Sequence, residues 1–330
     1  MNGLKKKKEM VITMSSDKGL AHQYQKKTDK EHILDNPDTY IGSVDNLENE
    51  THVFDHDSKR IKKKVACMNP GLYKLFDEAI VNCRDHAVRM RSAMETCKPN
   101  TIPLSTIEIQ ILEDGTITMF NDGNGIDIAM HPEHKIWIPE MIFAHLRTGT
   151  NYDKTEKKIV GGKNGFGSKL IFIWSTYGKI ETVDHVRRKI FTQEYHDNLD
   201  KKTEPIIKTC SKKPFTRITF KPDYKRLGME NLTKDMLDLF TKRVYDIAAV
   251  TDKQIKVKLN GDLIPIKTFQ QYVDLYIGSK DDTKRIYESF DSRWEYAVSL
   301  SPSEEFEQVS FVNGIFTGKG GKHVEYIRDQ

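Results

Sequence analysis

Residues 161–174 combine a glycine-rich segment with an apolar stretch that follows it directly. Glycine lets backbone N–H groups approach an anion closely, and the free N–H groups and positive dipole at a helix start strengthen that field. The apolar run 170–174 is typical of a helix, so the glycine-rich segment before it predicts a phosphate-binding loop. The predicted loop, residues 161–170, contains Gly162, Lys163, Asn164, Gly165, Phe166, Gly167, Ser168 and Lys169.

The residue order in this loop excludes the two commonest phosphate-binding patterns. A Walker A loop has Lys and then Ser or Thr after its last glycine, whereas Ser168 precedes Lys169 here. The G-x-G-x-x-G pattern of kinases and dinucleotide-binding folds has the opposite glycine spacing. A different nucleotide-binding fold is therefore expected.

A second candidate lies on a predicted helix that begins after Asn69, a favoured N-cap residue, with Pro70 at its first position. Glu78 and Asn82 stand one turn apart at the edge of the apolar face, so they can address one ligand. Partial desolvation makes a carboxylate such as Glu78 a better proton acceptor. The neutral oxygen of Asn82 suits Mg²⁺, which completes its shell with water and phosphate oxygens. Taken alone, this pair is more often an ordinary solvated helix edge. The apolar face, expected to be buried, consists of Leu72, Leu75, Phe76, Ala79, Ile80 and Cys83.

A third candidate follows a predicted β-hairpin. Isoleucines at 107, 109 and 111 alternate with polar residues, Asp114-Gly115 predicts a turn, and the returning strand 116–120 runs into Asn121-Asp122-Gly123-Asn124-Gly125. By itself this last segment is most often a tight turn, because Asn, Asp and Gly are what turns require. The three candidates in this order are more informative than any one of them.

The series Glu78-x-x-x-Asn82, Asn121-Asp122-Gly123-x-Gly125 and Gly162-x-x-Gly165-x-Gly167 resembles the motifs of one ATPase superfamily. Its members include gyrase, the ninety-kilodalton heat-shock chaperones, histidine kinases and the mismatch-repair protein MutL. Longer segments narrow the resemblance to the ATPase region of eukaryotic-type DNA topoisomerase II. These segments are 27–28, 31–34, 37–44, 70–74, 161–170, 311–315 and 319–324.

The resemblance implies a role for each matching residue. Glu78 would activate the water that attacks the γ-phosphate, Asn82 would bind Mg²⁺, and Asn121 would accept from the adenine amine through its side-chain carbonyl. Gly125 belongs to the same ATP-binding turn, and Thr216 matches a hydroxyl near the adenine. Ribose and phosphate contacts fall on Gly149, Thr150 and Asn151, and the phosphate loop on 162–169. Tyr40 resembles a residue that reaches into the nucleotide site of the other protomer.

A few positions depart from the family pattern. Gly149 and Thr150 replace a typical pair of serines, so one hydroxyl contact is expected to be lost. His86 stands where Asn is common, and Phe166 replaces a Tyr. Neither of these last two changes removes a charge from the reaction.

The resemblance implies an α+β fold: a Bergerat-type ATPase sandwich, with helices layered on one face of a mixed sheet, followed by the start of an α/β transducer domain. Residues 1–25 are expected to form a flexible arm, 26–265 the ATP-binding domain, and 266–330 the first part of a truncated transducer. The Gln-Thr-Lys tripeptide of family transducers is absent from the sequence. Hairpins are predicted over 180–195 and 206–220, and helices over 232–250 and 269–277. The charged segment 153–158 could act as a lid.

Composition adds limits on location and partners. The 330 residues have a formal net charge of +4, too small by itself to demonstrate nucleic-acid binding. Four cysteines without C-x-x-C spacing favour a reducing compartment, and the His/acid groups at 52–57 and 131–134 are expected to be surface loops. No apolar run is long enough for a membrane span and no signal peptide is evident. We therefore expect an intracellular protein, not a secreted or membrane protein, and the family resemblance implies the nucleus or another DNA-containing compartment.

The function implied is the ATP-operated entry gate of a type IIA topoisomerase, using ATP and Mg²⁺. ATP binding would drive formation of a homodimer, and double-stranded DNA would be handled by the complete enzyme. Two alternatives stay open on the residues: the ATPase of a related chaperone or mismatch-repair clamp, and a non-catalytic module that dimerises with nucleotide.

Overall fold

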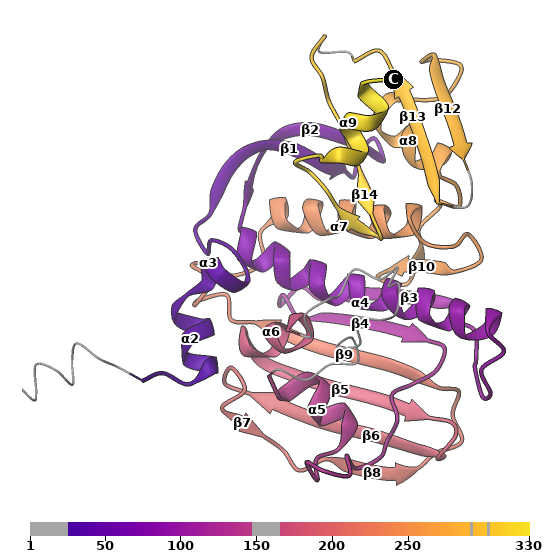
Figure 1. The fold of residues 1–330 in the computed structure, drawn as a ribbon. Coiled ribbons are helices and arrows are strands. Elements are labelled where there is room, and N and C mark those ends of the chain that lie inside the picture. The colour runs from indigo at the N-terminus through magenta and orange to yellow at the C-terminus, as the bar shows by residue number, and fades with distance from the viewer. Residues whose placement is uncertain (1–25, 147–165, 291–292, 302–303) are drawn as a thin grey trace, which may run out of the picture.

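A mixed nine-stranded sheet forms the base of the computed structural model, which describes residues 26–146, 166–290, 293–301 and 304–330 (Figure 1). The strand order is β11-β10-β3-β4-β9-β5-β6-β7, and β8 pairs with β6 as well. Only the β10–β3 pair is parallel among these strands. The strands are β3 Thr106–Ile111, β4 Ile117–Asp122, β5 Ser175–Asp184, β6 Lys189–His196, β7 Lys201–Lys202, β8 Ile206–Thr209, β9 Phe215–Pro222, β10 Lys256–Leu259 and β11 Asp262–Leu263.

Local signals set two turns of the sheet, and the first of them, at Asp114-Gly115, is the predicted one. Gly115 adopts φ +77° between β3 and β4, and the alternating isoleucines of β3 face the core. Asn260 and Gly261 both have positive φ, +49° and +90°, which is the type I′ geometry of a two-residue hairpin. The predicted 180–195 hairpin is also present as β5–β6.

The hairpin predicted over 206–220 is wrong. Both strands form, but β8 pairs with β6 through Phe191 and Ile207, whereas β9 lies between β4 and β5. The physical reason is burial: β9 carries the buried side chains of Ile218 and Phe220, which suit a central position, while β8 is largely exposed and suits an edge.

Helices cover one face of the sheet (Figure 1). Helices α4 and α7 contact each other there, and α6 packs against α4, β5 and β9. The predicted apolar face of α4 is buried, and the rings of Phe76 and Phe240 stack with centroids 4.0 Å apart. This core fixes α4 over the sheet. The helices are α4 Pro70–Glu95, α5 Ile138–Ala144, α6 Gly167–Ile173 and α7 Lys234–Ala249.

Two short helices, α2 Asp29–Asp35 and α3 Pro37–Tyr40, precede a separate hairpin of β1 Leu47–Asp55 and β2 Arg60–Met68. The hairpin lies against α7, outside the main sheet (Figure 1). Residues 52–55 therefore belong to a strand, which corrects the prediction of a surface loop there. They are held in β1 by pairing with residues 60–63 of β2.

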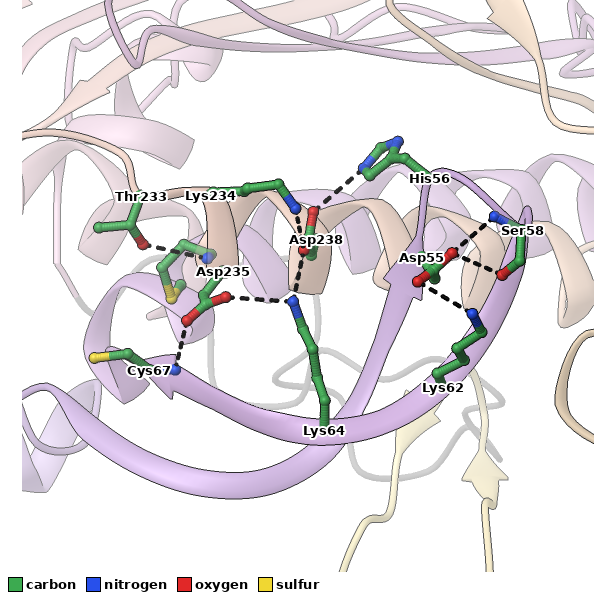
Figure 2. A network of polar contacts seen from close by, with 11 residues as sticks. Asp55, His56, Ser58, Lys62, Lys64, Cys67, Thr233, Lys234, Asp235 and Asp238 are labelled. Atoms are coloured by element: carbon green, nitrogen blue, oxygen red, sulfur yellow. Dashed lines mark hydrogen bonds and ion pairs between the residues drawn. The ribbon is translucent and has the colours of Figure 1, made fainter.

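Charged side chains fasten this hairpin to α7 (Figure 2). Nζ of Lys64 lies 3.0 Å from Oδ2 of Asp238 and 3.4 Å from Oδ1 of Asp235. The backbone N–H of Cys67 donates to Asp235 at 2.9 Å, and Nε2 of His56 lies 3.3 Å from Oδ1 of Asp238, whose side chain is buried. Strand β2 is thereby anchored just before the start of α4.

The C-terminal elements pack on the opposite side of α7 from the sheet (Figure 1). The helix predicted over 269–277 is present with those bounds, and strands form near residues 286, 296 and 311. The domain boundary near residue 265 stays a prediction. These elements are α8 Phe269–Ile277, β12 Arg285–Phe290, β13 Trp294–Ser299, β14 Phe311–Val312, β15 Ile315–Phe316 and α9 Lys322–Arg328.

Within the described ranges, no helix has both the length and the apolar character needed to cross a bilayer. In the same part of the chain, no cluster of three or more His, Cys, Asp or Glu side chains is placed to hold a metal ion.

Candidate active site

Asn69 fixes the position at which α4 begins. As predicted it is the N-cap: its Oδ1 accepts from the N–H of Leu72 at 2.9 Å. Its Nδ2 donates to the carbonyls of Val44 at 2.7 Å and Leu227 at 2.9 Å, and the residue is fully buried. Because its partners come from chain segments far apart in sequence, the first turn of α4 is tied to both.

Glu78 lies two turns into α4 and touches both its own helix and the start of α6. Its Oε1 is 2.6 Å from Nζ of Lys74, one turn earlier. Its Oε2 lies so close to Gly167 that a Cβ added there would be 1.8 Å from it. Only glycine fits at 167 with the carboxylate in this place. Burial disfavours the charged form of Lys74, but the Glu78 carboxylate outweighs it and raises the pKa of Lys74.

The described part of the predicted phosphate loop is 166–169. Phe166 is the N-cap of α6 and Gly167 its first residue, so the loop does run into a helix. The hydroxyl of Ser168 donates to the carbonyl of Ile142 at 3.1 Å, which ties α6 to α5. Lys169 is 1% exposed, and burial lowers the pKa of its ammonium to about 8. Gly162, Lys163, Asn164 and Gly165 lie outside the described residues.

The predicted turn after β4 is built by its own polar side chains. Oδ1 of Asp122 accepts from the N–H groups of Ser105 at 2.7 Å and Thr106 at 2.8 Å. Gly123 has φ +88°, a conformation that favours glycine. Asn121 is 6% exposed, and its Nδ2 donates to the carbonyl of Asp122 at 3.1 Å.

Thr182 of β5 brings three of the predicted contacts into one neighbourhood. Asn121 is the register partner of Thr216 on β9, and the hydroxyl of Thr216 lies 3.2 Å from that of Thr182. Thr182 also accepts from the N–H of Ile126 at 2.9 Å, next to Gly125. A Cβ on Gly125 would lie 2.0 Å from the carbonyl oxygen of Val183, so this glycine permits the close approach of the turn to β5.

His86 connects α4 to the same turn. Its Nε2 is buried, has no hydrogen-bond partner among the described residues, and would lie 3.3 Å from a Cβ on Gly123. Burial, and secondarily Arg89, lower the pKa of His86 to about 4, so the ring is neutral at physiological pH. Glu78, Asn82 and His86 follow one side of α4 at four-residue spacing. This side of α4 therefore contacts the start of α6 at Glu78 and the turn after β4 at His86. Asn82, which is partly exposed, lies between these two contacts.

Some predicted site residues do not lie near this side of α4 in the described structure. Tyr40 packs against the core, and its hydroxyl lies 3.0 Å from Nδ1 of His32. Gly149, Thr150, Asn151 and the predicted lid at 153–158 lie outside the described residues. A cleft of about 2580 Å³ opens elsewhere, between α4 and the C-terminal elements, and none of the predicted nucleotide contacts that the structure describes lines it.

Three residues of this region were not predicted as site residues. Lys74 stands four residues before Glu78, a spacing from which the helical ion pair could have been predicted. Thr182 is a polar residue at a fully buried position of β5, and the alternation of buried and exposed positions in that strand could have indicated its burial. Arg243, fully buried on α7, donates to Asp77 at 2.7 Å, and no local pattern indicates this contact.

Comparison with known proteins gives consistent matches along the chain. The sequence is 42% identical over 321 residues to DNA topoisomerase 2 of Arabidopsis thaliana, covering 95% of this chain and 21% of that protein. It is 44% identical over 313 residues to DNA topoisomerase 2-alpha of Gallus gallus, covering 93% and 19%. The crystal structure of the ATPase region of Saccharomyces cerevisiae topoisomerase II matches with a TM-score of 0.86 and 41% identity, over 94% of this chain and 79% of that one. No family model matches the chain.

The chain spans about a fifth of the length of the curated relatives it matches. At these identities over nearly the whole chain, the alternative of a chaperone or mismatch-repair clamp is not supported. The α+β fold expected from the sequence is confirmed by the structural match. Sequence and fold together show that the chain belongs to the DNA topoisomerase II family and corresponds to its ATPase region.

Proposed function

We propose that this chain binds ATP with Mg²⁺ and hydrolyses the γ-phosphate, acting as the ATP-operated entry gate of a type II DNA topoisomerase. The contact between the Glu78 carboxylate and Gly167 carries the proposal. It places a candidate general base of α4 directly against the end of the glycine-rich segment, where a phosphate-binding loop would present its ligand.

The residues at the other end of α4 suit a purine nucleoside. Asn121 is buried and offers a side-chain carbonyl to an exocyclic amine, and the Thr216 hydroxyl lies across from it in the sheet. The cradle formed where Gly125 meets β5 leaves no room for a side chain, as expected where backbone approaches closely. The polar side chains of Asn121 and Thr216, next to the backbone at Gly125, could hydrogen-bond and pack against an adenine ring. The contacts from Gly149, Thr150 and Asn151 to ribose and phosphate are part of the same proposal.

Asn82 fits Mg²⁺ by the chemistry of its donor, a neutral amide oxygen between the Glu78 end and the His86 end of α4. When bound, the ion would neutralise charge on the phosphate oxygens.

The chain's own groups supply the remaining steps. Glu78 orients the attacking water and accepts its proton, while Lys74 holds the other carboxylate oxygen at 2.6 Å and so limits rotation of the side chain. Phosphoryl transfer depends mainly on positioning and on stabilisation of charge. The buried ammonium of Lys169, at the start of α6, supplies positive charge beside the loop.

In the complete protein, ATP binding would close two copies of this region into a homodimer and trap a segment of double-stranded DNA, and hydrolysis would reset the gate. Tyr40 is proposed to reach the nucleotide of the other copy. The support for these steps is membership of the DNA topoisomerase II family; Tyr40 itself lies in α3.

Two substitutions test the assignment of Glu78 and Asn82. Glu78→Gln should leave nucleotide affinity nearly intact and lower single-turnover hydrolysis by roughly 10²- to 10⁴-fold, because an amide cannot accept the proton of water. Asn82→Ala should instead weaken Mg²⁺-dependent nucleotide binding. Calorimetric titration and single-turnover assays separate the two effects.

Glu95→Gln is the matched control, since Glu95 lies at the far end of the same helix and pairs with Arg91 on the surface. It should behave like the parent chain. Normal turnover by Glu78→Gln would show that another group is the base. Binding of nucleotide without any hydrolysis by the parent chain would favour the non-catalytic module instead.

A further inference from the structure

The turn between β14 and β15 docks onto α4 and α7. Asn313 and Gly314 adopt φ +53° and +80°, the geometry of a type I′ turn. Both carbonyls of the turn accept from arginine side chains. Nη1 of Arg84, on α4, donates to Asn313 at 2.9 Å, and Nη2 of Arg243, on α7, donates to Gly314 at 2.9 Å. Figure 1 shows β14 directed at α7 from the C-terminal elements.

Arg243 also holds the residue that precedes Glu78. Its Nε donates to Oδ1 of Asp77 at 2.7 Å, and the Arg243 side chain is fully buried. Asp77 and Arg84 stand two turns apart on one face of α4, so both can point toward α7 and the turn, while Glu78 faces Gly167. Since a helix moves as a stiff unit, any displacement at Asp77 is passed to Glu78.

The docking leaves little slack. A Cβ on Gly314 would lie 2.8 Å from Cδ and 2.9 Å from Nε of Arg84. Carbon atoms in ordinary contact are about 3.5–4.0 Å apart, so a side chain at this position must displace the arginine. The turn is therefore held on α4 by direct contact and by the hydrogen bond from Arg84, and on α7 by the hydrogen bond from Arg243.

Packing of the turn against the helices does not by itself require a buried arginine with charged and hydrogen-bonded partners. Replacing a buried ion pair by apolar residues of similar size is often neutral or stabilising. A guanidinium, in contrast, is a planar fork that fixes the direction of each partner. The Arg243 fork fixes Asp77 of the helix and Gly314 of the turn relative to each other, which an apolar junction would not do.

We propose that Arg243 is a positioning residue, which couples the β14–β15 turn of the C-terminal elements to the placement of Glu78 on α4. Movement of these elements would then change the rate of hydrolysis rather than the affinity for nucleotide. This inference rests on the proposed function, because it assigns Glu78 as the base whose place is being set.

The test compares Arg243→Lys and Gly314→Ala with the parent 330-residue chain. Lysine keeps the charge but loses the fork, and alanine at 314 displaces Arg84 without touching the buried core. Each should lower single-turnover hydrolysis by about tenfold to a hundredfold, the effect of a misplacement of about 1 Å. The dissociation constant for a non-hydrolysable ATP analogue should change by less than about threefold, since uniform binding is not lost.

Gly261→Ala is the matched control for backbone strain. Gly261 has φ +90° in the same kind of turn, and nothing lies within 4 Å of a Cβ placed there. It should hydrolyse ATP at the parent rate. Thermal unfolding of each variant shows whether it is folded; if Arg243→Lys is not, Gly314→Ala alone decides.

Combination with Glu78→Gln distinguishes positioning from general damage. If Arg243 and the turn act through Glu78, Arg243→Lys and Gly314→Ala should have no further effect on the residual rate of the Glu78→Gln chain. Parent-like hydrolysis in both variants, parallel loss of binding and hydrolysis, or an undiminished effect in the Glu78→Gln background would each overturn the inference. A parent chain that hydrolyses no faster than Glu78→Gln would instead overturn the proposed function itself.

Discussion

At the scale of single residues, the absence of a side chain at Gly167 decides where the Glu78 carboxylate lies. Oε2 occupies space that any Cβ would take, and Lys74 holds Oε1 from the other side. The carboxylate is therefore confined between α6 and its own helix. At this position glycine is required because a side chain would occupy the space of the carboxylate, and not only because glycine gives the backbone of a phosphate loop its freedom.

Gly167→Ala should consequently displace the Glu78 carboxylate. The obstacle is the end of a flexible side chain that is 24% exposed, so the fold should survive. We expect single-turnover hydrolysis to fall by roughly 10²-fold, since misplacement of a catalytic group by about 1 Å has effects of that size. Rapid-quench measurement of phosphate release checks this, with thermal unfolding as the test of integrity. An unchanged rate would show that the contact is not part of the catalytic arrangement.

His86 should make stability depend on pH. Burial lowers its pKa to about 4 in the folded chain, against about 6.5 when unfolded, so folding favours the neutral ring. The contribution of the neutral His86 ring to the free energy of unfolding is fully present above pH 6.5 and is lost as the pH falls toward 4. The loss amounts to roughly 3 kcal/mol from the size of the shift.

Urea unfolding between pH 7.5 and 4.5 measures this dependence. His86→Asn should flatten the acid side of the profile, whereas His134→Asn, at an exposed position, should leave it unchanged. Superimposable profiles for the parent and His86→Asn would contradict the assignment.

At the scale of elements, α4 is held at its start by Asn69 and along its length by α6 and α7. The β1–β2 hairpin supports the same end, because Asp235 of α7 binds the backbone of Cys67 and Met236 contacts the N–H of Asn69 through its sulfur. Residues of four different segments thus determine the position of the first turn, and through it the position of Glu78.

Asn69→Ala should lower the free energy of unfolding by about 2–4 kcal/mol. It removes an N-cap, worth about 1 kcal/mol, and leaves the part-buried carbonyl of Val44 and the buried carbonyl of Leu227 without this donor. Thr28→Ala removes a cap from the exposed helix α2 and should cost only about 1 kcal/mol or less. Equal losses for the two variants in chemical denaturation would show that burial of the Asn69 contacts adds nothing.

At the scale of the whole molecule, the proposed gate needs two copies. Tyr40 lies in α3, beside the start of α4, and its hydroxyl is hydrogen-bonded to His32 of the neighbouring helix α2. A ligand shifts a monomer–dimer equilibrium only by its differential affinity for the two states. A contact made by Tyr40 to the nucleotide of the other copy would supply part of that difference.

We expect the chain to be mostly monomeric without nucleotide and to dimerise weakly with a non-hydrolysable ATP analogue. Tyr40→Ala should weaken the nucleotide-dependent dimer by about tenfold or more, as loss of one good hydrogen-bonded contact would. Tyr40→Phe isolates the contribution of the hydroxyl. Light scattering with and without the analogue gives the equilibrium, and identical dimerisation by Tyr40→Ala would remove Tyr40 from the interface.

Local features of the structure follow directly from the sequence. The cap at Asn69, the alternation of β3, the Asn-Gly turn at 260–261 and the helix 269–277 each depend on residues within a few positions of one another. Their physical causes are hydrogen bonding, side-chain periodicity and backbone sterics over short range. The order of the three motifs also indicated the ATPase superfamily, and the longer segments narrowed the resemblance to the topoisomerase II family.

Contacts between distant segments required the tertiary structure. Because β8 and β9 are adjacent in sequence, they were wrongly predicted to form a hairpin. Instead the exposed strand β8 pairs with β6 at the edge of the sheet, and the more apolar β9 takes a central position. Sequence named Glu78 and Gly167 separately, but only packing of α6 against α4 brings them into contact. The link from Arg243 to Asp77 and Gly314 spans three elements. Such contacts depend on which surfaces become buried together, and no local pattern of residue types specifies that.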